Sequence, residues 1–211
     1  MKVLLGCEHS GTVRDEFIKI RPEWEVFSCD LLHNNHPNHI TGDVFEVLHQ
    51  DKWDLLIAHP PCQYLSVSGM HWTTRGLRDP KLTDDAVEFF RKMWTSQVPY
   101  ICLENPVSVI SSRICKPSQI VQPYQFGDDA SKKTCLWLQN LPKLQPTEYF
   151  PPGRIINGKP RWSNQLDSGH NNLPPSKDRW KIRSTTYPGI AKAMASQWIE
   201  YLEKNQQLSL L

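Results

Sequence analysis

The feature that most constrains the fold is a short apolar run that two prolines stop abruptly. Residues 55–58, Leu-Leu-Ile-Ala, have the pattern of a buried strand. Pro60 and Pro61 cannot continue it, because proline has a fixed φ and no N–H to donate to a ladder. Cys62 follows at the carboxyl end of the strand, the edge where ligands bind in an open α/β sheet. Its thiol is therefore either a functional group or a buried packing residue.

Strand-like and helix-like segments alternate along the chain. Helical spacing occurs at residues 12–20 and 189–202. Strand patterns occupy residues 3–5, 24–30, 55–58, 100–103 and 134–138. Such alternation predicts an α/β fold, with a mostly parallel sheet and helices on both faces.

Two stretches are less regular. Residues 67–82 are expected to form a loop, after which a helix opens at Thr83. Residues 146–184 lack periodicity, and a stretch of that length indicates a functional insertion or small subdomain. We therefore expect a main domain over 1–145, a small irregular segment over 146–184, and a C-terminal helix over 185–211 that returns to the main domain. The inner face of the helix after Thr83 is expected to consist of Ala86, Phe89, Phe90 and Met93.

The composition is that of a soluble single-domain protein. The chain has 211 residues, of which 39% are hydrophobic and 22% charged. It shows no run long enough for a membrane span and no secretory signal at its start. Six scattered cysteines without a Cys-x-x-Cys pair favour reduced thiols in the cytoplasm. A net charge of +2 is too small to indicate nucleic-acid binding by itself, although the basic excess lies in the second half.

Three strand ends carry groups that suit a nucleoside. The loop from Gly6 to Gly11 lies between a strand and a helix, where glycine lets the backbone approach a ligand and the helix offers free N–H groups. Its spacing fits neither the dinucleotide fingerprint nor a P-loop. Asp30 ends the second strand, where such sheets place an acid on ribose hydroxyls, and Asp43 is placed to meet an adenine amino group.

Four motifs resemble those of the cytosine-C5 DNA methyltransferases, in particular their short, phage-like form. Residues 60–63 (Pro-Pro-Cys-Gln), followed by Ser66, resemble the catalytic Pro-Cys-Gln motif, and residues 104–106 (Glu-Asn-Pro) are similar to the Glu-Asn-Val motif. Residues 5–11 resemble the S-adenosylmethionine loop, and residues 186–194 resemble the closing motif. The motifs follow the family's order over nearly the whole chain. The first two are fairly specific, whereas the other two are weak alone.

The resemblance implies an S-adenosylmethionine-dependent methyltransferase with a Rossmann-like sheet that methylates C5 of cytosine in DNA. Cys62 would add to C6 of a flipped-out base, which makes the ring able to attack a sulfonium methyl. Glu104 would act at N3 as an acid whose pKa is raised by burial. The resemblance places the cofactor at Gly6, Cys7, Glu8, Ser10, Gly11, Asp30, Asp43, Val44 and Pro60. It places the substrate at Gln63, Ser66, Asn105, Lys132 and Lys133.

The chain departs from the family in its substrate-recognition elements. The Gln-x-Arg-x-Arg motif is missing, and Lys132-Lys133 either replaces it or forms a solvated basic loop. The segment 146–184 is much smaller than the family's recognition domain, so weak or short sequence specificity is expected. Its basic and aromatic side chains suit phosphate contacts and base stacking. These are Arg154, Lys159, Arg161, Trp162, Lys177, Arg179, Trp180, Lys181 and Arg183.

Other readings use the same residues. Amino-methyltransferases carry Asp/Asn-Pro-Pro-aromatic at this strand end, but here His59 and Cys62 flank the two prolines. A zinc deaminase needs Pro-Cys-x-x-Cys, and the second cysteine is missing. His33, His36 and His39 have the composition of metal ligands but lie in an Asn/Pro loop, so no metal is expected.

Two alternatives for the function stay open. The same chemistry could act on RNA or a free cytosine nucleotide, or the chain could be a degenerate, non-catalytic fold that binds nucleic acid. Intact Cys62 and Glu104 oppose the second alternative. We expect the protein in the cytoplasm of a bacterium or of a phage-infected host cell.

Overall fold

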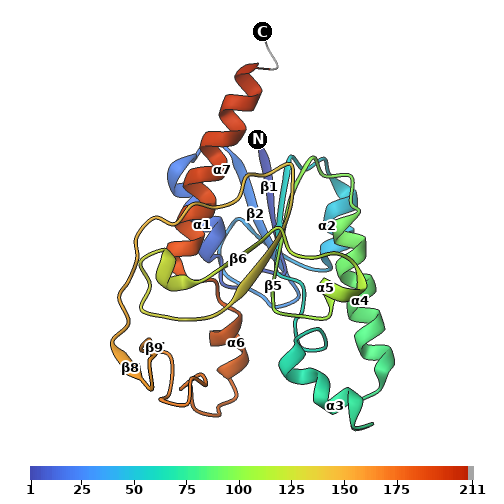
Figure 1. The fold of residues 1–211 in the computed structure, drawn as a ribbon. Coiled ribbons are helices and arrows are strands. Elements are labelled where there is room, and N and C mark those ends of the chain that lie inside the picture. The colour runs from blue at the N-terminus through green and yellow to red at the C-terminus, as the bar shows by residue number, and fades with distance from the viewer. Residues whose placement is uncertain (209–211) are drawn as a thin grey trace.

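The computed structural model describes residues 1–208, which form a seven-stranded sheet covered by helices (Figure 1). The strand order is β3-β2-β1-β4-β5-β7-β6. The first five strands in this order are parallel, whereas β7 is antiparallel to both of its neighbours. The predicted mostly parallel sheet is confirmed. The strands are β1 (Lys2–Gly6), β2 (Glu25–Asp30), β3 (His39–Thr41), β4 (Leu55–Ala58), β5 (Tyr100–Pro106), β6 (Gln119–Val121) and β7 (Thr134–Gln139).

Helices cover both faces of this sheet, as the sequence predicts. α1 (Thr12–Ile20) and α7 (Pro188–Leu208) pack on one face, where Phe17 and Trp198 are fully buried. α2 (Val44–Gln50), α4 (Pro80–Trp94) and α5 (Ile110–Arg113) pack on the other. Side chains of β4 alternate between the two cores, so that Ile57 faces α1 and α7 while Leu56 faces α2 and α4.

The register of the parallel strands sets which residues meet at their carboxyl ends. Gly6 is paired with Cys29 of β2 and with Ala58 of β4, and Ala58 is paired with Leu103 of β5. The next residue along each strand therefore lies at the same edge of the sheet. His59 and Glu104 stand one residue beyond the last pair of β4 and β5, and alternation turns both to one face.

Several local expectations were wrong. Residues 67–82 are not a plain loop, since they contain the 3-10 turn η1 (Val67–Gly69), the helix α3 (Met70–Thr74) and the start of α4. α4 begins before Thr83 because the carboxylate of Asp79 accepts a 2.9 Å hydrogen bond from the N–H of Lys81 and caps the helix. Its buried face is Thr83, Val87, Phe90 and Met93, whereas Ala86 and Phe89 are partly exposed. The three-residue strand β6 and the helix α5 were not foreseen, whereas β3 is the strand implied by the predicted position of Asp43 near a third strand end.

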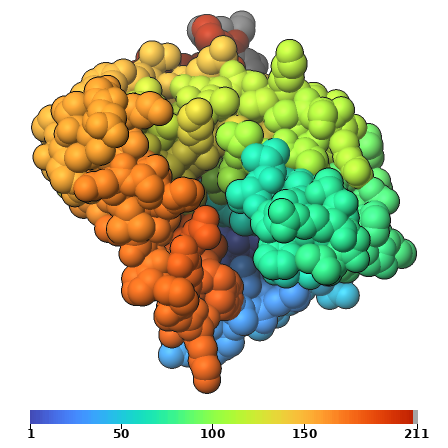
Figure 2. Space-filling model, turned by 60° about the horizontal axis from the view of Figure 1, so that its bottom comes forward, coloured from blue at the N-terminus to red at the C-terminus, as the bar shows by residue number. Residues whose placement is uncertain are grey.

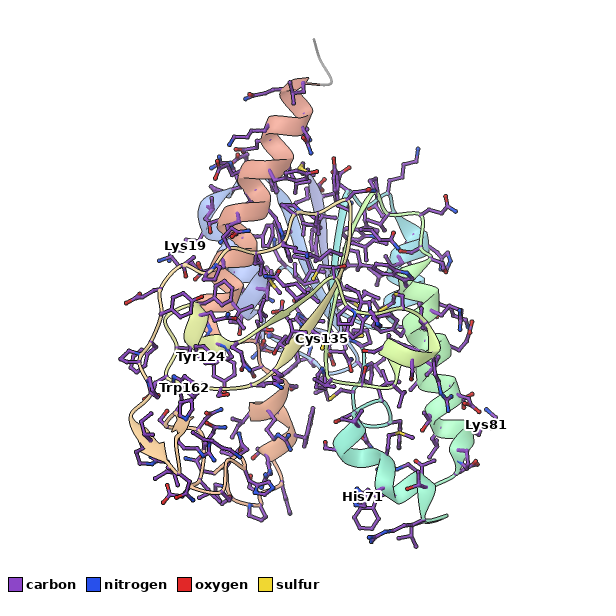
Figure 3. The ribbon with its side chains drawn as sticks, viewed as in Figure 1. Lys19, His71, Lys81, Tyr124, Cys135 and Trp162 are labelled. Atoms are coloured by element: carbon purple, nitrogen blue, oxygen red, sulfur yellow. The ribbon has the colours of Figure 1, made fainter. Side chains whose placement is uncertain are left out.

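The irregular segment 146–184 contains a hairpin of β8 (Arg154–Ile156) and β9 (Lys159–Arg161), followed by α6 (Arg179–Ser184). It is anchored through Trp162, which stacks on Tyr124 of the 3-10 turn η2 (Pro123–Gln125) with ring centroids 4.2 Å apart (Figure 3). Over residues 1–208, no helix is both long and apolar enough to cross a bilayer.

Candidate active site

The carboxyl ends of the parallel strands form the floor of a hollow. Figure 2 shows the hollow between the teal segment that holds α3 and the orange segment that holds α6, with the dark-blue N-terminal residues at its base. Both flanking segments project beyond the sheet at this edge (Figure 1). The arrangement brings the loop after β1, the turn after β4 and the end of β5 together, as the sequence predicts for an open α/β sheet.

The turn after β4 presents an accessible cysteine. The N–H groups of Leu65 and Ser66 both donate to the carbonyl of Cys62, at 3.1 and 3.0 Å, and so fix a tight turn. Asn105 of β5 donates a 2.8 Å hydrogen bond from its side-chain amide to the carbonyl of Pro60. Cys62 itself is exposed. A rigid turn, tied to the neighbouring strand, therefore holds the thiol at the edge of the sheet.

The thiol of Cys62 is surrounded by charges from three other elements. Partial removal of water raises its pKa, the carboxylate of Glu104 raises it further, and the cations of Lys132 and Arg183 oppose this increase. Lys132 precedes β7, and its ammonium donates to the carbonyl of Arg183 in α6 at 2.9 Å. The structure thus places Lys132 and Arg183 within electrostatic range of Cys62, a relationship that the sequence did not reveal for Arg183.

Glu104 is paired with a histidine. Nδ1 of His59 lies 3.1 Å from Oε2 of Glu104, and the side chains are 10% and 12% exposed, respectively. Burial alone raises the pKa of Glu104, but the hydrogen bond from His59 and the charges of Lys132 and His59 bring it below its ordinary value. The expected raised pKa is therefore wrong, because sequence reasoning considered burial without the cationic neighbours.

Glu8 occupies the N-terminus of α1. Its carboxylate accepts hydrogen bonds from the N–H groups of Val13 at 2.7 Å and Arg14 at 3.3 Å, and the residue is 3% exposed. The expectation of free N–H groups at this helix end is therefore wrong for these two. Burial raises the pKa of Glu8, while His59, the two N–H groups and the charge of Arg14 oppose that shift.

The two strand-end aspartates lie near each other and near Cys7. Burial raises the pKa of Cys7, and the negative charges of Asp30 and Asp43 both add to the increase. Asp30 accepts a 2.9 Å hydrogen bond from the N–H of Leu32, and Asp43 accepts one of 2.7 Å from the N–H of Phe45, which caps α2. The structure therefore brings together the acids and the loop that the sequence predicts for a nucleoside, although Asp43 also has a structural role.

The remaining cofactor candidates shape the loop. Gly6 is closely packed, since a Cβ there would lie 3.0 Å from Cγ2 of the buried Val44. Gly11 has a φ of 73°, and a Cβ there would collide with the guanidinium of the buried Arg14. Ser10 is exposed and accepts a 3.1 Å hydrogen bond from the hydroxyl of Thr12. Pro60 is buried.

The substrate candidates differ in their position. Gln63 is exposed beside Cys62, and Ser66 hydrogen-bonds Ser68 at 2.8 Å. Asn105 is buried and holds Pro60, so its amide supports the turn. Lys133 is exposed, and its charge acts on Cys135.

The irregular segment 146–184 uses part of its charge in contacts within itself. Arg154 forms an ion pair with Asp167 at 3.2 Å, and Arg161 donates to the carbonyl of Asp167 at 3.0 Å. Trp162 is 7% exposed, so the expectation that it can stack on a base is wrong. Trp180 on α6 is 57% exposed and keeps an open face. Besides Arg154, the exposed cations of this segment are Lys159, Lys177, Lys181 and Arg183.

The histidines of the loop over residues 33–39 form hydrogen bonds with other groups of the protein. His39 pairs with the hydroxyl of Ser28 at 2.8 Å and with the carbonyl of Leu32 at 2.9 Å, which uses both ring nitrogens. Nδ1 of His36 accepts a 3.1 Å hydrogen bond from the N–H of Asn38. In the part of the chain that the structure describes, no group of three or more His, Cys, Asp or Glu side chains is arranged to hold a metal ion.

The strand order, with β7 inserted antiparallel between β5 and β6, is typical of methyltransferases. The sheet therefore has the topology expected of the Rossmann-like fold that the motif resemblance implies. Two solved structures are similar. One is described as a DNA modification methyltransferase encoded within a prophage of E. coli, with 15% identity, a TM-score of 0.47, and coverage of 72% of this chain and 52% of that one. The other is the Entamoeba histolytica methyltransferase EhMeth, with 13% identity, a TM-score of 0.49, and coverage of 79% and 62%. The aligned part covers less than two thirds of the length of each of these two solved structures. No protein-family model and no curated protein sequence matches the chain.

Sequence reasoning missed one residue of this site. His59 attracted notice only because it stands where amino-methyltransferases carry an acid or amide. Its role as the partner of Glu104 follows from the register of β4 and β5, and that register also offers the signal that could have found it. A histidine one residue beyond the last buried position of a strand, beside an acid at the same level of the next strand, is expected to pair with that acid.

Proposed function

We propose that the protein transfers the methyl group of S-adenosylmethionine to C5 of cytosine in DNA. The observation that carries the proposal is the accessible thiol of Cys62 at the carboxyl end of β4, within the electrostatic influence of Glu104 at the end of β5. A nucleophile and an acid that come from neighbouring strand ends can act on one base between them.

The groups around the loop after β1 fit a nucleoside cofactor that carries no phosphate. Glu8 fills the N-terminus of α1, so a phosphate would meet a carboxylate where phosphate-binding sheets offer free N–H groups. Asp30 and Asp43 offer carboxylate oxygens, which are acceptors for ribose hydroxyls and an adenine amino group. Gly6, Cys7 and Gly11 would lie beside the cofactor. When bound, S-adenosylmethionine supplies an electrophilic methyl group.

Cys62 acts as the nucleophile in this proposal. Its thiol loses a proton to water, and the thiolate forms a bond to C6 of cytosine, which makes C5 nucleophilic. Lys132 and Arg183 lower the cost of this ionisation, because their charges favour the thiolate. Glu104 protonates N3 as electron density moves onto the ring. After methylation, C5 loses its proton to water and the bond from sulfur to C6 breaks.

The irregular segment 146–184 is the recognition segment in this proposal, and its exposed cations would contact the DNA backbone. Lys177, Lys181 and Arg183 lie on or near α6 at the side of the hollow, and Trp180 offers an aromatic face for a base. Few groups are available to read base edges, so short sequence specificity is proposed. Binding through backbone contacts should weaken steeply as salt rises.

The test is incubation with labelled S-adenosylmethionine and DNA that contains 5-fluorocytosine. Fluorine at C5 cannot leave as a proton, so the adduct between enzyme and base should persist and map to Cys62 by peptide mass spectrometry. Cys62→Ser should form no adduct and still bind the cofactor in calorimetry, while Glu104→Gln should slow transfer roughly 10²-fold or more. Methyl transfer by Cys62→Ser at the wild-type rate would refute the proposal.

Parallel reactions with RNA and with a free cytosine nucleotide identify the substrate. Labelled product on DNA alone supports the proposal as stated. If labelled product forms only on RNA or only on the nucleotide, the proposed reaction is retained and DNA is replaced by that molecule as the substrate. An affinity for DNA that does not change with salt would contradict backbone-dominated binding.

A further inference from the structure

A buried histidine at the candidate site contacts the carboxylate of Glu104 and lies within electrostatic range of the carboxylate of Glu8. Nδ1 of His59 is 3.1 Å from Oε2 of Glu104, and the His59 side chain is only 10% exposed. Its other ring nitrogen, Nε2, is buried and has no hydrogen-bond partner within residues 1–208. A buried ring nitrogen without a partner is costly, so the position of this ring requires an explanation beyond packing.

Charged groups from several elements surround the ring. Glu104 comes from β5, Glu8 from the loop after β1, and Lys132 from the segment before β7. Burial lowers the pKa of His59, but the hydrogen bond and charge of Glu104, followed by the charge of Glu8, raise it above its ordinary value despite the opposing charge of Lys132. Two carboxylates therefore favour a proton on the imidazole.

This environment addresses a difficulty in the proposed reaction. Glu104 must deliver a proton to N3, yet its cationic neighbours hold its pKa below the ordinary value, so alone it would be ionised at neutral pH. A coupled pair titrates as a unit, and the proton that Glu104 lacks is held on His59 at the other end of a 3.1 Å hydrogen bond.

On the basis of the proposed function, we propose that His59 is a positioning residue that orients the Glu104 carboxylate and stores the proton that Glu104 delivers to N3 of the target cytosine. His59 contacts no substrate atom in this role. It acts through Glu104, and its two neighbouring carboxylates keep the stored proton in place between turnovers.

The proton balance of the step closes within the pair. The pair begins with one proton, which moves from Nδ1 of His59 to Glu104 and then to N3 as the sulfur of Cys62 bonds to C6. The electron pair of the C5–C6 double bond shifts to form a C4–C5 double bond, and the electron pair of the C4–N3 double bond moves to N3, where it accepts the proton. The pair is left as neutral imidazole and carboxylate. After C5 is methylated and its proton passes to water, the bond from sulfur to C6 breaks, the C5–C6 double bond re-forms, and N3 returns its proton to the pair.

The test compares kcat/KM of wild type and His59→Asn for methyl transfer across pH. Asparagine can still donate a hydrogen bond to Glu104 but cannot store a proton. The ratio of wild type to variant should increase with pH and level off at tenfold or more above the pKa of the wild-type pair, because each unit of pKa lost by the pair lowers its protonated fraction about tenfold. The ionisation of Cys62 depends on the charge of Glu104, so the pH dependence of Cys62 alkylation is measured in both proteins and divided out of the ratio. His49→Asn, an exposed substitution in α2, should give a ratio of 1 at every pH.

A constant ratio at all pH values would assign His59 a structural role alone and overturn the inference, while activity of the wild type would leave the proposed function intact. Ring ¹⁵N NMR provides a readout that needs no activity, with the His59 signal assigned by its loss in His59→Asn. His59 should titrate above its ordinary value of 6.5, and Glu104→Gln should lower that pKa. An unchanged titration in Glu104→Gln would refute proton storage even if the wild type methylates no cytosine.

Discussion

The side-chain amide of Asn105 donates a 2.8 Å hydrogen bond to the carbonyl of Pro60 and ties the end of β5 to the turn that carries Cys62. This hydrogen bond supplements the two by which the N–H groups of Leu65 and Ser66 close the turn on the carbonyl of Cys62. Asn105 is buried, and its Oδ1 has no hydrogen-bond partner within the described chain. The asparagine of the Glu-Asn-Pro stretch therefore positions the thiol through the turn.

We expect Asn105→Ala to reduce kcat/KM about tenfold and the free energy of unfolding by about 1–3 kcal/mol, because the buried carbonyl of Pro60 loses its donor. Steady-state kinetics and urea unfolding measure the two effects. Asn140→Gly is the matched control, since Asn140 donates an equally long 2.8 Å hydrogen bond to the carbonyl of Pro99 at an exposed position away from Cys62. Equal loss of activity in both variants would contradict a positioning role.

Gly11→Ala should lower the free energy of unfolding more than Gly76→Ala does. Both glycines have positive φ, 73° and 71°, so alanine costs about 1–2 kcal/mol of backbone strain at each position. A Cβ at Gly11 additionally collides with the guanidinium of Arg14, whereas a Cβ at Gly76 meets no heavy atom of the described residues within 4 Å. Urea unfolding of both variants isolates the collision. Equal destabilisation would show that Arg14 moves aside freely.

Lys132→Ala should make Cys62 less reactive towards iodoacetamide at neutral pH. The pKa of Cys62 already lies above its ordinary value of 9.0, so alkylation should rise with pH beyond this value, and removal of the Lys132 cation should move the midpoint higher. Glu104→Gln should move it lower, because a charge that disfavours the thiolate is removed. Mass spectrometry of the Cys62 peptide follows the reaction.

Lys133→Ala is the matched control for this measurement, because the adjacent lysine is exposed and its charge acts on Cys135. The midpoint of Cys62 alkylation should not change in that variant. Equal shifts in the two lysine variants would show that only the general positive charge of the loop matters.

Asp30→Ala should weaken S-adenosylmethionine binding about tenfold, as expected when a charge-assisted hydrogen bond of about 1.5 kcal/mol is lost. Asp43→Asn separates the two roles of Asp43, because asparagine retains an oxygen that can cap α2 at the N–H of Phe45 while the charge is removed. Isothermal calorimetry should show weaker binding with an unchanged melting temperature for Asp43→Asn. Unchanged binding in both variants would remove these acids from the cofactor site.

The sequence by itself determined the alternation of strands and helices and the residues that stand at the strand ends. Apolar runs such as residues 55–58 must be buried, and Pro60 and Pro61 must end the strand, whatever the rest of the chain does. The sheet class and the grouping of the loop after β1 with Asp30 and Cys62 at one edge follow from these local rules together with parallel strands. The three-residue strands β3 and β6 are too short to give a pattern.

Only the tertiary structure decided the charge state of the site and the surfaces that stay open. The pKa of Glu104 depends on His59, 45 residues away in sequence, and on Lys132, and no local pattern reports such neighbours. Likewise, Trp162 is buried because Tyr124 offers it a stacking partner, whereas Trp180 in the same segment remains exposed. Local sequence patterns reflect backbone preference and burial, while electrostatic interactions act between side chains that the fold brings together from distant parts of the chain.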